Sequence, residues 1–436
     1  MRTAEQLSAK ALHELYAHGD LRPSAHVAAI LDRIEEEDSD QLAYVAVDRA
    51  GALEAARRAD GSFRTGQSAT ALCGIPVSVK DLLDVVGMPT GRGRGGAAPI
   101  ATGDSPVVAA LRRSGAVILG KTRTSEDGWS ASTVGAPGAA TANPWHPDRT
   151  AGGSSGGAAC AVATGLGAVA IGTDGAGSVR IPAAWCGVVG FKPSWERWEY
   201  GPRGDRLSHV GPLTTCVEDA VAVDEILAPA RGEDFGYIDR PPRLAWLELS
   251  HASHLGAAMR SSLNDLMDEP IVSARLDTGG AYEALVCLLA AGEYPRLALG
   301  DLWPGHAEVA ALGAHLAAED LRRAEQTCGR LAERLDDAFE GCDALALPTA
   351  AVPAFGRGEE FPPGTAIPDW LAWAENTYVA NLTGHPAISL PWGIGPDGVP
   401  AGLQLIGRRG RDRALLSVAC DVQAALGEWT RRKVCA

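Results

Sequence analysis

Short apolar segments typical of β-strands alternate with helical patterns along this chain, and this alternation limits the fold more than any other feature. The segment 74–81 (GIPVSVKD) precedes a helical pattern at 107–113 and an apolar run at 116–119. The helical segment 158–165 (AACAVATG) leads into a strand-like run at 167–174. Strands that alternate with helices predict a largely parallel sheet buried between helices. We therefore expect an α/β fold.

The rest of the chain shows no internal repeat and no sharp break in composition. A single domain over 1–436 is therefore the simpler expectation. Near its end, 386–392 and 401–407 are two β-type runs joined by the turn GPDG. We expect a helical segment at 1–65, a core at 66–220, a variable and mostly helical region at 225–340, and core strands with a helix at 341–436.

Composition excludes several classes of function. The formal net charge of −15 disfavours nucleic acid and anionic membranes as partners. The nine cysteines are scattered without a CxxC pair, which predicts reduced, buried thiols and no zinc site. Neither a secretory leader nor an apolar stretch of about 18 residues is visible, so we expect a cytoplasmic protein. We expect no cofactor and no metal.

Two serines stand in glycine-rich surroundings. The stretch 150–157 (TAGGSSGG) contains Ser154 and, taken alone, is typical of a flexible loop or of an anion-binding loop before a helix. Downstream, a strand ends in a tight turn that delivers Ser178. A nucleophilic serine needs such a turn, because backbone N–H groups beside it must receive a developing oxyanion. Gly175 and Gly177 allow the backbone to make this turn.

A serine nucleophile also needs a base. The only histidine near either serine motif is His146, which sits in a turn. Lys80, however, ends the apolar run GIPVSVK, where a solvated lysine is not expected. Burial lowers the pKa of a lysine, and a neutral lysine can accept a proton. Lys80 is therefore our candidate base.

Taken together, these segments resemble the amidase signature family. The resemblance rests on GIPVSVKD, on GGSSGG, and on a glycine-rich turn followed by SVRIP and CGVVGFKP. Ser178 follows Ser154 by 24 residues, which matches the spacing in that family. The resemblance covers most of 20–220 and resumes at 342–349 and 381–407, whereas 225–340 matches poorly.

The resemblance implies a role for each matching residue. It implies Ser178 as the nucleophile, Lys80 as the base, and Ser154 as a bridging serine that follows Gly153 through a cis peptide bond. The implied oxyanion hole consists of the backbone N–H groups of Gly175, Ala176, Gly177 and Ser178. The implied supporting residues are Ser155, Asp174 and Arg180.

One position departs from the family pattern, because Ala176 stands where the family usually has glycine. The added methyl group leaves the N–H in place, so we expect the function to survive. Roles for other side chains follow from their positions in the sequence. We expect a substrate pocket built from Trp129, Trp303, Trp370, Trp373 and Tyr378, structural roles for His209 and His385, and solvated surface charges at Arg92, Arg94, Arg408 and Arg409.

The resemblance implies an α/β/α sandwich with a large mixed central sheet flanked by helices. It also implies hydrolysis of the C–N bond of a small amide, with a carbamate or an ester as open alternatives. We expect a monomer or a homodimer. A second hypothesis is an amidotransferase-type subunit that works with a partner protein. A third, a binding protein on an inactive scaffold, is disfavoured because all three triad residues are present.

Overall fold

The structure is a computed structural model that describes residues 7–68, 70–135, 138–198, 206–228, 238, 240–249, 255–300 and 302–434. The described cysteines are all free thiols, and Cys435 lies outside the described residues. Among the described helices, none combines the length and the apolar character needed to cross a membrane.

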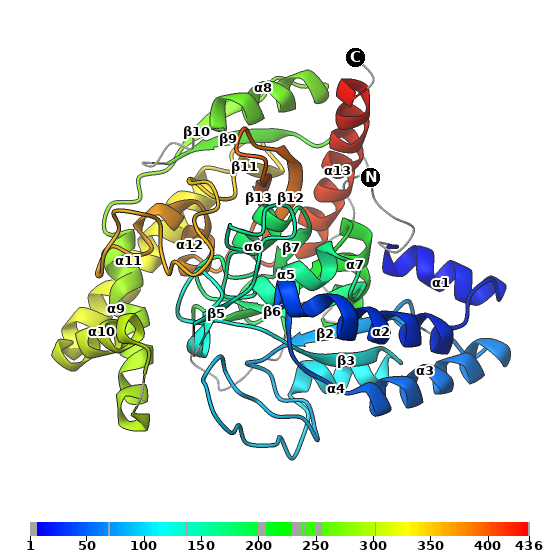
Figure 1. Cartoon of the computed structure of the whole chain (residues 1–436). Helices are drawn as coiled ribbons and strands as arrows, with labels where there is room; N and C mark the ends of the chain where they lie inside the picture. The colour runs from blue at the N-terminus through cyan, green and yellow to red at the C-terminus, as the bar shows by residue number, and fades with distance from the viewer. Residues whose placement is uncertain are drawn as a thin grey trace.

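A mixed sheet of eleven strands runs through the described chain (Figure 1). Its order is β1 (Tyr44–Val47), β3 (Val117–Thr122), β2 (Pro76–Lys80), β6 (Val169–Asp174), β8 (His209–Thr214), β7 (Val189–Lys192), β12 (Ala387–Ile394), β13 (Pro400–Ile406), β11 (Ala344–Pro348), β9 (Leu244–Glu248) and β10 (Val272–Arg275). The pairs β2–β3, β2–β6, β9–β11 and β9–β10 are parallel, and the others are antiparallel. The expected α/β fold with a mixed sheet is confirmed. The largely parallel sheet that the strand–helix alternation predicted is wrong, because most strand pairs are antiparallel.

Helices surround this sheet. They are α1 (Ala9–His18), α2 (Pro23–Gln41), α3 (Arg49–Arg64), α4 (Pro106–Arg113), α5 (Gly156–Ala163), α6 (Arg180–Cys186), α7 (Val217–Leu227), α8 (Gly256–Leu266), α9 (Ala281–Glu293), α10 (Pro304–Leu312), α11 (Ala318–Asp337), α12 (Glu375–Leu382) and α13 (Asp412–Val434). Short 3-10 turns are η1 (Glu126–Gly128), η2 (Tyr294–Leu299), η3 (Gly313–His315) and η4 (Ala372–Ala374). A small hairpin pairs β4 (Val134–Gly135) with β5 (Ala139–Ala140).

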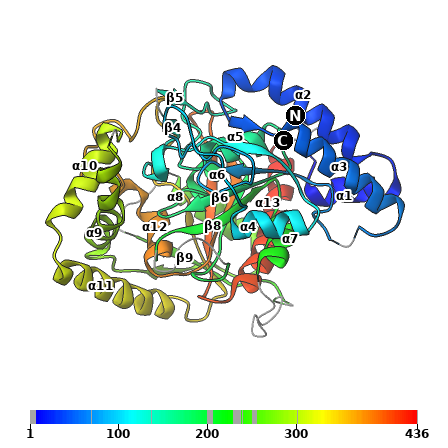
Figure 2. The same ribbon diagram turned by 90° about the horizontal axis from the view of Figure 1, so that it is seen from below.

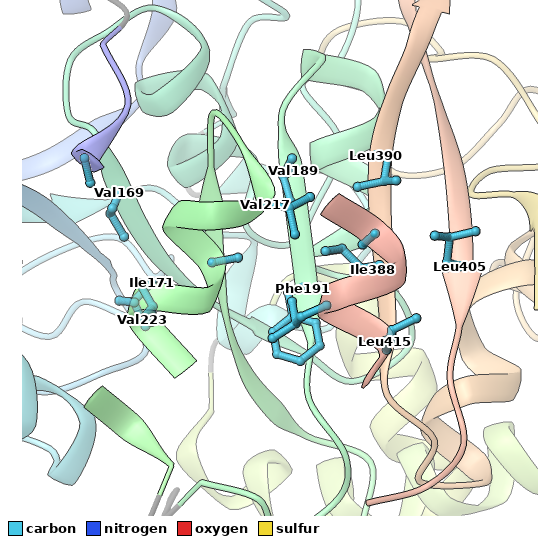
Figure 3. Packing of buried hydrophobic residues seen from close by; sticks show 14 of the residues in the cluster. Val169, Ile171, Val189, Phe191, Val217, Val223, Ile388, Leu390, Leu405 and Leu415 are labelled. Carbon is cyan, nitrogen blue, oxygen red and sulfur yellow. The ribbon is translucent and has the colours of Figure 1, made fainter. Parts of the chain in front are cut away.

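Alternate strand residues face two separate helix layers. On one face, Phe191 and Ile388 pack with Val217 of α7 and Leu415 of α13 (Figure 3). On the other face, neighbouring strand residues such as Ala170 pack with α5 and α6. Each large apolar side chain buried in this way contributes about 1.5–3 kcal/mol. Because successive side chains of a strand point to opposite faces of the sheet, each strand packs against helices on both faces.

The strands β1, β9 and β10 lie in segments that were expected to be helical or mostly helical. The segment 1–65 was expected to be helical, but β1 adds an edge strand that pairs with β3. The region 225–340 was expected to be mostly helical, but it also contributes β9 and β10. These strands are only four or five residues long, so their sequence pattern does not by itself distinguish a strand from a helix. Hydrogen bonding to a neighbouring strand is what makes them strands. Because β9 and β10 extend the same sheet, we propose that the whole chain forms one domain.

The parallel pairing of β2 and β6 brings the carboxyl ends of both strands to one edge of the sheet. Lys80 is the last residue of β2, and Asp174 is the last residue of β6. Helices α9, α10 and α11 gather on the opposite side of the molecule from α1, α2 and α3 (Figure 2). These three helices therefore lie far from the N-terminal helices.

Candidate active site

Lys80 is completely buried at the end of β2. Its Nζ donates hydrogen bonds to Ser154 Oγ at 2.6 Å, Ser155 Oγ at 2.9 Å and Thr173 Oγ1 at 2.9 Å. Burial lowers the pKa of Lys80 well below its usual value, and the negative charge of Asp174 opposes this shift only in part. The amine is therefore surrounded by hydroxyl groups and can exist uncharged, as a base must.

The loop before α5 presents Ser154 to this amine. The Gly153–Ser154 peptide bond is cis, in agreement with the resemblance. A side chain at Gly153 would place its Cβ 2.3 Å from the carbonyl oxygen of Ser132, so only glycine fits there. Ser154 and Ser155 are both buried. Ser155 Oγ also donates to the carbonyl oxygen of Thr173, which fixes the loop to the end of β6.

Ser178 follows β6 on a turn and is partly exposed. It lines the same cavity as Ser154. Within the described chain, however, no hydrogen bond joins Ser178 Oγ to Ser154 Oγ, so only the Lys80–Ser154 part of the predicted relay is formed. Catalytic hydrogen bonds are often long without substrate and shorten when it binds.

The turn itself is organised by the carboxylate of Asp174. Its Oδ1 accepts the backbone N–H of Gly177 at 2.8 Å, and its Oδ2 accepts that of Val179 at 3.1 Å. The expectation that Gly177 supplies an oxyanion donor is therefore wrong, because its N–H already has a buried carboxylate acceptor. In the described structure, no intramolecular acceptor faces the amides of Gly175, Ala176 and Ser178.

Arg180 connects this turn to the C-terminal part of the chain. It is completely buried and donates to Asp174 Oδ1 at 2.9 Å, to Gln404 Oε1 at 2.7 Å and to Asn381 Oδ1 at 2.6 Å. Burial alone would raise the pKa of Asp174, but the adjacent guanidinium holds it well below its usual range. We expect removal of either charge to destabilise the fold, because it would leave the other buried without its partner.

Sequence reasoning missed Thr173, Thr377, Asn381 and Gln404. Thr377 Oγ1 donates to the carbonyl oxygen of Ala176, and Asn381 Nδ2 donates to Asp174 Oδ1. A signal was available for Gln404, since a glutamine inside the apolar strand AGLQLIG needs buried partners. The partner residues, however, lie far away in the sequence.

A cavity of about 620 Å³ opens onto the two serines. Its wall includes Ser154, Ser178, Gly175 and Ala176. The apolar part of the wall consists of Leu82, Leu83, Trp129, Ala131, Leu289, Val309, Trp370 and Leu371. The cavity therefore places both serines and the turn amides beside an apolar surface.

The aromatic pocket prediction is partly wrong. Trp129 and Trp370 line the cavity, but Trp373, Tyr378 and Trp303 do not. Trp373 stacks on the ring of Trp185 with centroids 5.8 Å apart. Tyr378 packs against another tyrosine, at position 282. Because residues 370–378 pass through η4 and α12, successive aromatic side chains point in different directions.

Arg92 and Arg94 are not free surface charges as expected. Both donate to the buried carboxylate of Asp127, Arg92 through Nε at 2.6 Å. Arg296 Nη1 reaches the same carboxylate at 2.7 Å. Burial opposes ionisation of Asp127, but these guanidinium groups hold its pKa below the usual value. These ion pairs join η1 to the loop at 92–94 and to η2 beside the cavity.

The remaining assignments from the sequence agree better with the structure. Arg408 and Arg409 are exposed. His209 is buried with its Nδ1 at 2.7 Å from the carbonyl oxygen of Leu207. His385 stacks on a phenylalanine, and its Nε2 lies 3.1 Å from Asp336 Oδ1. Neither histidine lines the cavity.

Among the residues that the structure describes, one group of side chains has ligand atoms close enough for a metal ion. Atoms of Glu126, Asp127 and His306 lie within 4.8 Å of one another. Each is already engaged, Asp127 with arginines and both nitrogens of His306 with carboxylates. We therefore assign no metal to this group.

Replacing Gly177 with alanine should destabilise the protein by about 1–3 kcal/mol. Gly177 has φ +121°, and a Cβ there would lie 2.4 Å from Thr377 Oγ1. Thermal unfolding measures the loss. As a control, Gly61→Ala lies inside α3 with nothing near its new Cβ, and should leave stability equal or slightly higher. Equal unfolding temperatures for Gly177→Ala and wild type would contradict the packing described for this turn.

The fold is shared with known proteins. The sequence model of the family described as Amidase matches residues 25–275 and 304–416. The chain belongs to the amidase signature family. Amidase signature enzymes hydrolyse amide C–N bonds, and the chain shares their fold.

Its relatives in the amidase family match it over nearly the full length. A putative amidase, AmiB2, of Mycobacterium tuberculosis is 31% identical and covers 98% of this chain and 97% of its own. An acylamidase of Rhodococcus erythropolis is also 31% identical, with the same coverage of both chains. One component of the glutamyl-tRNA(Gln) amidotransferase of Desulforapulum autotrophicum is 30% identical, covering 96% and 97%.

Solved amidase structures are similar as well. A crystal structure of an amidase superposes with a TM-score of 0.85 at 30% identity, covering 96% of this chain and 99% of that one. A bacterial aryl acylamidase of the amidase signature family has a TM-score of 0.83 at 25% identity, with coverages of 98% and 97%.

Proposed function

We propose that this amidase cleaves its substrate with Ser178 as nucleophile, Ser154 as proton relay and Lys80 as base. The observation that carries the proposal is the hydrogen bond of 2.6 Å between the buried Lys80 amine and Ser154 Oγ, at the wall of a cavity shared with Ser178. A lysine in this position has no carboxylate within hydrogen-bond distance among the described residues. Structural lysines are usually paired when buried, so proton transfer explains this one better.

The proposed reaction has two halves. The neutral amine of Lys80 takes the proton of Ser154 as Ser154 takes the proton of Ser178, whose oxygen attacks the substrate carbonyl. The proton then passes back to the leaving nitrogen, the C–N bond breaks, and an acyl group stays on Ser178. Water, deprotonated by the same relay, cleaves the acyl ester and restores the serine.

The developing oxyanion needs donors that face the cavity. The amides of Gly175, Ala176 and Ser178 are the candidates, since Gly177 is engaged by Asp174. One such donor typically contributes about 3 kcal/mol to the stability of the transition state. The buried Asp174–Arg180 pair supports the proposal, because it holds the turn rigid before substrate arrives.

The apolar part of the cavity wall fits an amide with an aromatic or apolar group, and the charged residues Asp84, Arg92, Asp104, Asp127, Glu293 and Arg296 line the rest of the cavity. Trp129, Trp370, Leu289 and Val309 supply an apolar surface close to the two serines. The acylamidase and aryl acylamidase named above act, as their names say, on acyl amides. We therefore propose anilides and other apolar acyl amides as the preferred substrates, with apolar carbamates as the next class to test.

Incubation with an activated aryl carbamate should label the protein with one carbamoyl group on Ser178. Carbamoyl-enzymes are released slowly, so the adduct should accumulate and be located by peptide mass spectrometry. Prior incubation with an anilide substrate should slow the labelling. A stable adduct on another residue, with Ser178 unmodified in an active preparation, would contradict the proposed nucleophile.

A second candidate function follows from the similarity to the amidotransferase component. A protein of this kind would need its partner protein for activity and would release ammonia from glutamine. The purified chain tested alone distinguishes the two functions. We expect it to hydrolyse anilides without a partner and to show no glutaminase activity.

A further inference from the structure

His306 of α10 lies between two carboxylates, of which Glu293 lines the cavity. Its side chain is completely buried. Its Nδ1 lies 2.7 Å from Glu126 Oε1, and its Nε2 lies 2.8 Å from Glu293 Oε2. Glu126 follows the end of β3 in η1, whereas Glu293 ends α9. One imidazole therefore links the signature core to two helices of the variable region.

The two contacts require an additional proton. A carboxylate can only accept hydrogen bonds, and a neutral imidazole has one donor and one acceptor. With a carboxylate at each nitrogen, His306 must donate from both, which only the imidazolium can do. If it were neutral, the lone pair of one nitrogen would face a negatively charged oxygen at hydrogen-bond distance.

The linked elements carry part of the cavity wall. The ring of Trp129 stacks on His306 with centroids 5.7 Å apart and planes 4° apart. A Cβ at Gly305 would lie 2.8 Å from this indole, so α10 approaches it as closely as glycine allows. Trp129, Glu293 and Val309 all line the cavity. A shift of α10 would therefore move the surface proposed to bind the apolar part of the substrate.

We propose that His306 is a positioning residue whose imidazolium fastens α9 and α10 to Glu126 and Trp129, and so maintains the substrate-binding wall. The expected effect on substrate binding rests on the proposed function, whereas the protonation of His306 can be measured independently of it. When the imidazolium loses its proton, one of the two contacts becomes repulsive and the wall loosens. Substrate binding weakens, whereas the serines and Lys80, which lie on other elements, keep their arrangement.

The charged groups around the ring determine the direction of the pH effect. Burial opposes the charge on His306, but Glu293 and Glu126 together raise its pKa above the usual value. Glu360 is a further acid near Glu126, and burial together with the charges of Glu308 and Glu126 raises the pKa of Glu360 to about 7.

Opposing positive charge comes from one side of the ring. Arg296 Nε lies 2.6 Å from Glu293 Oε2, and the same guanidinium also pairs with Asp127. Arg92 and Arg94 also form ion pairs with the carboxylate of Asp127. Because its pKa is raised, the imidazolium persists to a higher pH than a free imidazolium would, and it is lost as the pH rises through that raised value. We therefore expect KM to increase on the alkaline side.

The kinetic test compares His306→Gln with wild type on an anilide substrate across pH. Glutamine can donate to one carboxylate only, so KM should rise about tenfold and lose its alkaline dependence, while kcat changes less than about threefold. Near-ultraviolet circular dichroism shows whether the variant keeps its tertiary packing.

A second variant tests whether the alkaline rise in KM depends on the second proton of the His306 ring. In Glu293→Gln the new amide can donate to a neutral His306 Nε2, so the contact no longer needs the imidazolium. Because Glu293 also lines the cavity, we expect KM at neutral pH to change by less than in His306→Gln, and to show no alkaline rise. Glu333→Gln, an exposed position on α11 outside this group of charges, is the matched control and should keep the wild-type profile.

Nitrogen-15 NMR of the histidine rings provides a test that does not depend on hydrolysis. We expect both nitrogens of His306 to be protonated at neutral pH, with the signal assigned by its loss in His306→Gln. A neutral ring at neutral pH would overturn the inference, as would a wild-type KM profile in His306→Gln. Neither result would affect the role of Ser178, which the labelling experiment tests separately.

Discussion

Replacing Ser178 with alanine should lower kcat for anilide hydrolysis by about four orders of magnitude or more, with KM changed little. The methyl group removes the attacking oxygen, while the cavity wall that binds the substrate stays intact. Residual activity would come only from binding and from the oxyanion donors. Initial rates over a range of substrate concentrations separate kcat from KM.

The matched control for this variant is Ser208→Ala. Ser208 also lines the cavity but has no proposed chemical role. Its replacement should leave kcat within about threefold of wild type. Comparable activity in Ser178→Ala and wild type would show that another group attacks the carbonyl, and the proposed acyl-enzyme mechanism would then be wrong.

Replacing Lys80 with methionine should lower kcat by about three orders of magnitude while the fold is retained. Methionine fills a similar volume but cannot accept the proton of Ser154, which now meets Lys80 Nζ at 2.6 Å. In wild type, activity should fall as the pH falls through the lowered pKa of Lys80, because a protonated amine is no longer a base.

The same residue should make stability depend on pH. The pKa of Lys80 is lower in the folded than in the unfolded chain, so the unfolded chain binds the extra proton first as the pH falls. Lys80 therefore weakens the fold progressively below its unfolded pKa, down to its folded pKa. Relative to Lys80→Met, the wild-type free energy of unfolding should increase as the pH rises toward the ordinary lysine pKa of about 10.4.

Denaturant unfolding of both proteins at several pH values measures this difference. A difference that stays constant with pH would show that Lys80 carries its full charge in the fold. An active Lys80→Met variant would show that a different base works with the serines.

Several features of the site could be predicted because their signals are local. Lys80 ends an apolar strand, where a charged amine is out of place. Ser154 and Ser178 follow glycines within one or two residues, and glycine permits close backbone approach and unusual φ values. The family resemblance implied that Ser154 bridges Lys80 and Ser178, and in the structure Lys80 Nζ donates a hydrogen bond to Ser154 Oγ.

Other features could not be predicted, since they depend on contacts between distant segments. The amide of Gly177 was assigned to the oxyanion hole, but it donates a hydrogen bond to the carboxylate of Asp174 instead. Trp370 and Trp373 are three residues apart, yet only Trp370 reaches the cavity. The sequence shows the aromatic cluster but not the direction in which each ring points.

The sequence by itself determined the strand–helix alternation, the family resemblance and the glycine-rich turns, because periodicity and turn chemistry operate over a few residues. Only the tertiary structure decided which side chains meet across the chain. Arg180 forms hydrogen bonds with Asn381 and Gln404, and His306 with Glu126, although about two hundred residues separate the partners in the sequence. Such contacts depend on how the sheet and helices pack, and packing depends on the whole chain at once.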